Sequence, residues 1–287
     1  MNYADVFFTS ADGLRLYARD YAGPDAAAPT VLCLHGLTRN SKDFDNLARH
    51  LASRARIIVP DTRGRGRSDR ATDLTTYRPE AYVSDVLKLL DLLRLPAVHL
   101  IGTSMGGLMS MMLLARAPER VRSVVINDIG PQVEAAGLQR IAGYVGQDGG
   151  EAKAQTWLAA TETVRRINAD AFPDFTQRDW EDMTRNLHVQ IDERVMLDYD
   201  PAIARGLADG TAAPDLWQLF EGLAPRPMLV LRGELSDLLS AATVDRMCAH
   251  SKLVQARVVA RRGHAPSLDE PDARAAIDAF LAVQLSA

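Results

Sequence analysis

The sequence predicts an α/β fold: a mostly parallel sheet with helices on both faces. Short apolar runs alternate with longer segments of helical periodicity, and this alternation is typical of strands joined by helical crossovers. One apolar run, beginning at Val98, ends in a Gly-rich turn and is followed at once by an apolar helix pattern. The 287 residues are 47% hydrophobic, enough for one large core or for a core plus an inserted lobe.

The predicted elements follow in order along the chain. A hairpin is expected first, because residues 6–8 and 15–21 flank the turn signal Asp12-Gly13. Further strands are predicted from apolar runs at residues 30–34, 56–61, 98–101, 121–128, 227–233 and 256–260. Helices are predicted from apolar spacings of three and four at residues 43–53, 79–93, 105–117, 241–249 and 271–285. This makes eight strands in the expected sheet.

The alternation is interrupted between residues 132 and 224, where no buried strand is evident and helical stretches dominate. We therefore expect a core domain formed by residues 1–131 and 225–287, with residues 132–224 inserted as a helical cap. The aromatic side chains of this segment are expected in the interior of the cap or in the wall of an apolar pocket. They are Tyr144, Trp157, Phe172, Phe175, Trp180, Tyr199, Trp217 and Phe220.

Composition narrows the possible partners. The net charge of −4 indicates no general attraction to nucleic acid or to anionic membranes. The N-terminal residues have no signal-peptide pattern and no apolar run could cross a bilayer, so we expect a cytoplasmic protein without membrane insertion. No metal site and no cofactor are expected, because the chain has no Cys/His cluster of suitable spacing and no His-Glu-x-x-His pattern. The oligomeric state is left open.

The turn after residue 101 has the nucleophile-elbow pattern Gly102-x-Ser104-x-Gly106. The serine backbone is strained in such a turn, and the flanking glycines let strand and helix approach closely. A serine hydroxyl is a weak nucleophile, so it needs a base within hydrogen-bond reach and a third group that orients the base.

The candidate base is His264, in the loop after the last predicted strand, because such a loop can deliver a side chain to the carboxyl edge of the sheet. His35, at the end of the strand over residues 30–34, lies close to the same edge. Asp128 and Asp237 each follow a predicted strand, so local structure does not choose between them as the acid. Glu234 is a weaker third candidate.

Several of these motifs together resemble the α/β-hydrolase superfamily, in its capped, serine-nucleophile, carboxylesterase-like branch, over nearly the whole chain. The chain order Ser…Asp…His is the order of that superfamily. The matching residues are His35-Gly36, Arg63-Gly64-x-Gly66-x-Ser68, Gly102-Thr103-Ser104-Met105-Gly106-Gly107, Asp237 and Gly263-His264.

The resemblance implies Ser104 as nucleophile, His264 as base and Asp237 as acid. It also implies an oxyanion hole formed by the backbone N–H groups of Leu37 and Met105. The alternative acid matches a position that some members of the superfamily use instead, namely Asp128. Epoxide hydrolases and haloalkane dehalogenases of this fold carry aspartate at the elbow, so the serine argues against both.

Candidate substrate contacts are His35, Arg39 and Leu238. Arg39 is placed to meet a substrate carboxylate, or else is a solvated loop arginine. Residues 61–70 contain four arginines but no P-loop ending, and we interpret them as a turn-rich loop whose arginines are partly countered by Asp61 and Asp69.

The sequence therefore predicts a serine hydrolase that cleaves carboxylic esters of small to medium apolar substrates through an acyl-enzyme on Ser104. The partner expected is a small-molecule ester or a related carbonyl compound. Alternatives on the same triad are a carbon–carbon bond hydrolase of the meta-cleavage type, a lactonase and an acyltransferase. A receptor-like relative that binds a ligand under the cap is a more remote alternative.

Overall fold

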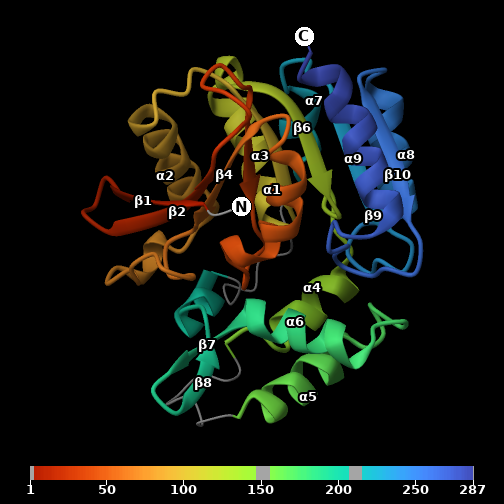
Figure 1. Ribbon diagram of the computed structural model, residues 1–287. Coiled ribbons are helices and arrows are strands. Elements are labelled where there is room, and N and C mark those ends of the chain that lie inside the picture. Colours follow the sequence, from red (N-terminus) through yellow and green to blue (C-terminus); the bar gives the residue numbers. More distant parts are fainter. Residues whose placement is uncertain (1–2, 147–155, 207–214, 287) are drawn as a thin grey trace.

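The protein is built on an eight-stranded sheet with the strand order β1-β2-β4-β3-β5-β6-β9-β10, which confirms the predicted α/β class (Figure 1). The computed structural model describes residues 3–146, 156–206 and 215–286. The pairs β1–β2 and β2–β4 are antiparallel, and the other neighbours are parallel. The strands are β1 (Ala4–Thr9), β2 (Arg15–Tyr21), β3 (Thr30–Leu34), β4 (Arg56–Asp61), β5 (Val98–Thr103), β6 (Val121–Asn127), β9 (Met228–Gly233) and β10 (Val254–Val259).

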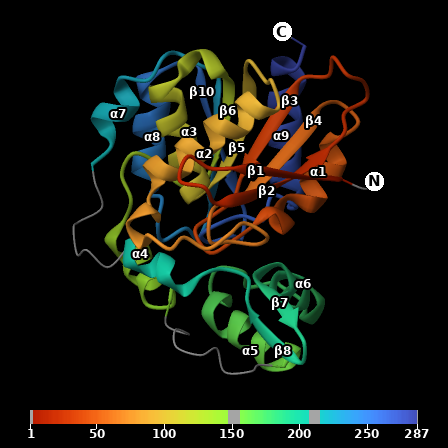
Figure 2. The same ribbon diagram turned by 90° about the vertical axis from the view of Figure 1, so that its left-hand side faces the viewer.

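Helices cover both faces of the sheet (Figure 2). Because side chains alternate along a strand, Leu32 and Leu34 of β3 join one apolar cluster while Val31 and Cys33 join the other. The first cluster is closed by α2 (Pro79–Leu92), α3 (Met105–Arg116) and α8 (Ala241–His250), and the second by α1 (Asp45–Leu51) and α9 (Pro271–Gln284). Short 3-10 helices lie at η1 (Ser41–Phe44), η2 (Leu74–Thr76), η3 (Pro118–Arg120) and η4 (Pro201–Gly206).

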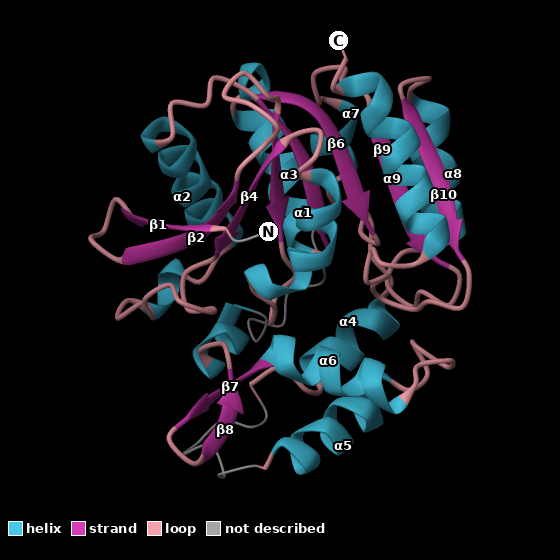
Figure 3. Ribbon diagram, in the orientation of Figure 1, coloured by secondary structure: helices cyan, strands magenta, loops and turns pink. Residues whose placement is uncertain are grey.

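Residues 132–224, here called the inserted segment, leave the sheet after β6 and return to it at β9. Within the described part of this segment, helices and one hairpin lie across the carboxyl ends of the strands (Figure 3). They are α4 (Ala135–Ala142), α5 (Trp157–Asn168), α6 (Gln177–Leu187), β7 (His188–Ile191) and β8 (Arg194–Leu197). A further helix, α7 (Trp217–Glu221), packs instead against the core beside α8 (Figure 2).

The β7–β8 hairpin was not expected in a segment predicted to be helical. Its strands have only four residues each and are largely solvent-accessible, so no buried apolar run marks them in the sequence. The hairpin pairs antiparallel, with His188 opposite Leu197. No helix among the described residues has the length and apolar character required to span a bilayer.

The inserted segment is attached to the core on both sides of the sheet edge. On one side, Lys42 Nζ lies 2.8 Å from Asp198 Oδ2 and also donates to the carbonyl groups of Arg185 and His188. On the other side, the Gly263 amide donates to the Ala171 carbonyl at 2.7 Å. These contacts hold the segment over the carboxyl ends of β3, β5 and β6.

Candidate active site

The turn between β5 and α3 presents Ser104 at the carboxyl edge of the sheet. Its backbone has φ 52° and ψ −116°, a strained conformation outside the helical and extended regions. A Cβ atom on Gly106 would lie 2.0 Å from the Leu34 carbonyl oxygen, and one on Gly102 would lie 2.3 Å from the Gly106 carbonyl oxygen. The turn is therefore possible only with glycine at both positions, as the sequence pattern predicts.

A chain of hydrogen bonds connects Ser104, His264 and Asp128. His264 Nε2 lies 2.8 Å from Ser104 Oγ, and His264 Nδ1 lies 2.8 Å from Asp128 Oδ2. Because an ionised carboxylate can only accept hydrogen bonds, we infer that Nδ1 carries the ring proton. The neutral ring then leaves Nε2 free to accept the serine hydroxyl.

Asp128 lies at the end of β6 and is completely buried. Besides His264, it accepts hydrogen bonds from the Gly233 amide at 2.8 Å and from Ser236 Oγ at 2.7 Å. These donors compensate the carboxylate for the water that it loses on burial. Sequence reasoning did not find Ser236, because nothing in its local sequence indicates that the loop after β9 turns back toward β6.

Asp237 does not occupy the position expected for the acid. Its carboxylate pairs with the Arg140 guanidinium from α4, at 2.6 and 2.9 Å, and its side chain is 35% exposed. Hydrogen bonding to Arg140 lowers the pKa of this carboxyl group below its usual range. The structure thus places the alternative candidate, Asp128, against His264, and the expectation for Asp237 is corrected. Glu234 instead accepts the Arg261 amide at 2.7 Å.

The segments that carry Leu37 and Met105 both lie beside the elbow. Strands β3 and β5 are parallel neighbours with Leu34 opposite Gly102, so the segments that follow both strands emerge side by side. A Cβ atom on Gly36 would lie 3.8 Å from Ser104 Cβ, which places this loop directly against the serine. Met105 begins α3, so its amide has no acceptor within the helix.

Two of the three candidate substrate contacts do not line the cavity. His35 is buried, its Nδ1 donates to the Gly36 carbonyl at 2.7 Å, and its Nε2 accepts the Thr62 amide at 3.0 Å. Burial lowers the pKa of His35 to about 4, so this neutral ring joins two loops instead of facing a substrate. Leu238 is 1% exposed and packs in the core. The backbone at Leu238 is packed closely against α4, since a Cβ atom on Gly137 would lie 2.8 Å from Leu238 Cα, and Leu238 is absent from the cavity wall.

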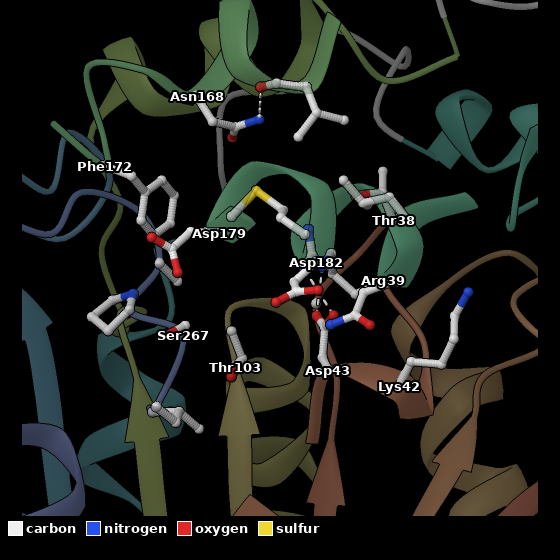
Figure 4. Close-up of a pocket in the computed structure, with 18 of the residues that line it drawn as sticks. Thr38, Arg39, Lys42, Asp43, Thr103, Asn168, Phe172, Asp179, Asp182 and Ser267 are labelled. Carbon is white, nitrogen blue, oxygen red and sulfur yellow. Dashed lines mark hydrogen bonds and ion pairs between the residues drawn. The ribbon is translucent and has the colours of Figure 1, made fainter. Parts of the chain in front are cut away.

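A cavity of about 780 Å³ opens above Ser104 and His264, between the sheet edge and the inserted segment. In Figure 4, Thr103 lies at the end of β5, with Asn168 and Phe172 of the inserted segment across the space from it. Arg39 lies in the wall, where it forms a two-point ion pair with Asp43 at 2.5 and 2.7 Å.

The wall of this cavity is not uniformly apolar, which corrects the expectation drawn from the aromatic residues. Tyr144, Phe172, Phe175 and Tyr199 do line it, whereas Trp180 packs inside the inserted segment. Charged side chains line the same space: they include Arg39, Asp43, Asp179, Asp182 and Arg262. The described residues contain no group of three or more His, Cys, Asp or Glu side chains placed to share a metal ion.

The arginine-rich loop is turn-rich as predicted, with positive φ at Gly64 and Gly66, but its charge partners differ from those expected. Asp61 accepts the backbone amides of Ser41 and Arg67, and Asp69 accepts that of Arg15. The observed ion pairs are Arg63 with Asp12 and Asp85, and Arg67 with Asp5. The expected partners are close in sequence, whereas the observed partners come from other elements of the fold.

Comparison with known proteins agrees with this architecture. A profile of the α/β-hydrolase fold family matches residues 29–271. The chain belongs to this family. It is 36% identical over 264 residues to a 3-hydroxybutyrate-oligomer hydrolase of Cupriavidus necator, with 86% of each chain covered. It is 30% identical over 224 residues to a 2-(acetamidomethylene)succinate hydrolase of Mesorhizobium japonicum, covering 77% of this chain and 76% of that one.

Among solved structures, an α/β hydrolase from Novosphingobium aromaticivorans superposes with a TM-score of 0.90 at 43% identity, covering 98% of this chain and 99% of that one. Its similarity extends over the sheet and the inserted segment alike. Both curated relatives named above are hydrolases, and hydrolase activity is supported for this chain at the level of the family.

Proposed function

We propose that this protein is a carboxylic-ester hydrolase that works through an acyl-enzyme on Ser104, with His264 as base and Asp128 as the acid. The observation that carries the proposal is the continuous hydrogen-bond chain from Ser104 Oγ through both ring nitrogens of His264 to Asp128. A nucleophile, a base and an orienting acid in this order are what acyl transfer by serine requires.

In the first half of the reaction, His264 Nε2 takes the proton of Ser104 as Oγ attacks the carbonyl carbon of the ester. The imidazolium that forms keeps its Nδ1–H bond to Asp128, whose negative charge stabilises it. His264 then donates the proton from Nε2 to the departing alkoxide oxygen, and the acyl group remains on Ser104.

The backbone amides of Leu37 and Met105 donate hydrogen bonds to the carbonyl oxygen as it becomes negatively charged. Leu37 follows β3 by three residues and Met105 begins α3 directly after the elbow, so both donors belong to the folded backbone before charge develops. The Met105 amide also lies at the N-terminus of α3, where the helix dipole favours negative charge.

In the second half of the reaction, a water molecule replaces the alcohol. His264 takes one proton from this water as its oxygen attacks the acyl carbon, and then returns the proton to Ser104 Oγ as the acid leaves. The same hydrogen-bond chain thus serves both halves, with Asp128 unchanged throughout.

The inserted segment acts as a cap that selects the substrate. The relative from Cupriavidus necator, which acts on 3-hydroxybutyrate oligomers, is similar over most of both chains. Such oligomers carry ester carbonyls, short aliphatic groups and polar ends, and a wall that mixes aromatic and charged side chains suits this combination. We therefore propose short hydroxyacyl esters as the substrate class.

The test compares Ser104→Ala with the wild type on 3-hydroxybutyrate trimer and on p-nitrophenyl esters of increasing acyl length. We expect the variant to lose at least about 10³-fold in kcat while unfolding at the same temperature. Ser84→Ala on the exposed side of α2 is the matched control and should keep full activity. Mass spectrometry should find a fluorophosphonate adduct on Ser104 in the wild type and none in Ser104→Ala.

Including a lactone, a ring-fission dienoate and an added alcohol acceptor in the same assay separates the alternatives. Faster turnover of the lactone or of the dienoate than of every ester would replace the proposed substrate class. Faster acyl transfer to the alcohol than hydrolysis would indicate an acyltransferase. Ester turnover that is unaffected by Ser104→Ala would contradict the whole proposal.

A further inference from the structure

Arg65 is a buried cation beside the backbone groups assigned to the oxyanion. It lies in the loop after β4, and only 1% of its surface is exposed. It is the largest of the fully buried side chains in the described residues. It is one of the four arginines of the turn-rich loop over residues 61–70, and the mechanism above does not use it.

The guanidinium group of Arg65 contacts both residues that supply the oxyanion amides. Nε donates to the Leu37 carbonyl at 2.9 Å, and Nη2 lies 3.9 Å from Met105 Sδ. The remaining contacts hold the group in place: Nη1 donates to the Arg63 carbonyl at 2.7 Å and to Tyr82 Oη at 3.1 Å. One planar fork thus spans the segments that follow β3 and β5.

Among the residues that the structure describes, no carboxylate forms an ion pair with Arg65, whereas Arg63 pairs with two carboxylates and Arg67 with one. Its positive charge is balanced only by carbonyl and hydroxyl dipoles and by the faces of Tyr82 and Tyr77, 5.0 and 5.7 Å from Cζ. A buried charge without an ion-pair partner is costly. It is useful where negative charge appears transiently in the same dry region.

The loop that carries Arg65 is fixed from two sides, so the guanidinium group cannot easily move. The Gly66 amide donates to the Asp198 carbonyl at 2.9 Å, and the Asp200 amide donates to the Gly64 carbonyl at 2.7 Å. A Cβ atom on Gly66 would lie 2.1 Å from the Asp61 carboxylate, so the loop has no room for another residue there.

We propose that Arg65 is the positioning residue of the oxyanion hole: its fork fixes the Leu37 loop against the start of α3, and its charge favours the oxyanion. The inference rests on the proposed function, because it requires a negative oxygen between the two amides. Arg65 need not touch the substrate. It acts through Leu37 and Met105.

The experiment compares Arg65→Met with Arg67→Met. Both changes remove an arginine from the same loop, but Arg67 is half exposed, pairs with Asp5 and contacts neither oxyanion residue. We expect Arg65→Met to lower kcat by about 10- to 100-fold with KM within about threefold, since misplacing a catalytic group by a fraction of an ångström has effects of this order. Arg67→Met should leave both parameters unchanged.

Two matched inhibitors give a readout that a purely structural role would not change. A trifluoromethyl ketone adds Ser104 Oγ to its carbonyl carbon, the serine proton passes to His264, and the carbonyl oxygen becomes an oxyanion. The corresponding methyl ketone binds without that charge. In Arg65→Met, the inhibition constant of the trifluoromethyl ketone should rise by the same factor by which kcat falls, while that of the methyl ketone stays constant.

Equal losses of affinity for the two ketones, or a kcat equal to that of Arg67→Met, would overturn the inference. If Arg65→Met does not fold, Arg65→Lys replaces it: a single ammonium group cannot span Leu37 and Met105, so a selective loss of about three- to tenfold is still expected. Wild-type kinetics for Arg65→Lys would overturn the inference as well. A wild-type enzyme whose activity does not depend on Ser104 would instead refute the proposed function.

Discussion

The ends of β6 and β9 carry similar acidic residues in very different surroundings. Asp128 after β6 is fully buried and accepts hydrogen bonds from Gly233, Ser236 and His264. Asp237 after β9 is 35% exposed, and its carboxylate is held by one arginine of the inserted segment. Both positions are at the carboxyl edge of the sheet, where catalytic groups of α/β folds lie.

The difference shows that the partners of a carboxylate, and not its place at a strand end, determine what it can do. Asp128 is surrounded by donors from the core, so it can hold His264 in one orientation. Asp237 is neutralised by Arg140, and the ion pair fastens α4 to the loop after β9. One carboxylate is therefore suited to catalysis and the other to attaching the inserted segment.

The largest effect is expected from exchanging each carboxylate for its amide. Asp128→Asn should lower kcat by about 10³- to 10⁴-fold, because the amide can donate to Nδ1 and so favours the wrong tautomer of His264. Asp237→Asn should change kcat by less than about threefold. Steady-state kinetics on the preferred ester, with circular dichroism to verify folding, measures both. The reverse ranking would return the role of the acid to Asp237.

The same comparison shows which parts of the site could be predicted from the sequence and which could not. The elbow could be predicted because its glycines and serine are adjacent in the chain and the turn itself demands them. The position of His264 at the sheet edge followed from the order of strands. The choice of acid could not be predicted, since it depends on Arg140, a residue of the inserted segment whose packing no periodicity reveals.

Arg65 illustrates a second limit of the sequence. In an arginine-rich loop, each arginine is by composition most simply a solvated side chain. Whether one of them is buried depends on Tyr82 from α2 and on the loop after β3, which come together only in the folded sheet. Similarly, the β7–β8 hairpin is formed by pairing between two short strands that are only partly buried, and no apolar pattern marks it.

His35, just after β3, resembles Asp128 in being buried. Both of its ring nitrogens are hydrogen-bonded. Burial lowers the pKa of His35 to about 4 in the folded chain, from an ordinary value near 6.5. At pH values between these two, the unfolded chain therefore binds a proton at His35 that the folded chain does not bind. Stability should therefore fall as the pH is lowered through this range, by up to about 3 kcal/mol from this group.

Urea unfolding of wild type and of His35→Gln at a series of pH values tests this assignment. The variant can keep both hydrogen bonds but does not titrate. It should be less stable than wild type at pH 7, with a difference that narrows as the pH falls toward 4. Burial also lowers the pKa of His99 to about 4. Because His99 is present in both proteins, its contribution cancels in the difference between their stabilities. A difference that is constant with pH would mean that His35 does not titrate as described.

A smaller effect is expected from Ser236, which connects the two strand ends. Its hydroxyl donates to Asp128 and accepts the Leu239 amide at 3.0 Å. Ser236→Ala should lower kcat by about three- to tenfold, because one of three donors to the buried carboxylate is lost. Ser240→Ala, which removes the N-cap of α8 in the same loop, should lower stability without affecting kcat. Equal kcat values for the two variants would indicate that Ser236 only stabilises the loop.

The smallest effect should come from Arg140→Met, which breaks the ion pair at the end of β9. Both partners are about one-third exposed, so we expect a loss of less than about 1 kcal/mol in the free energy of unfolding at pH 7. The pKa of Asp237 is lowered in the folded state, so this contribution is present above the ordinary value near 4 and disappears as the pH falls below it.

The difference between wild type and Arg140→Met should accordingly shrink as the pH falls below about 4, and it should also shrink at 1 M salt, where exposed pairs are screened. Asp237→Asn should reproduce the loss, and the double variant should add little to either single change, because both remove the same interaction. Activity gives the complementary information. If Arg140→Met changes KM but not kcat, the pair acts by attaching α4 above the cavity. A fall in kcat as large as that of Asp128→Asn would show instead that the two strand ends are not separate in function.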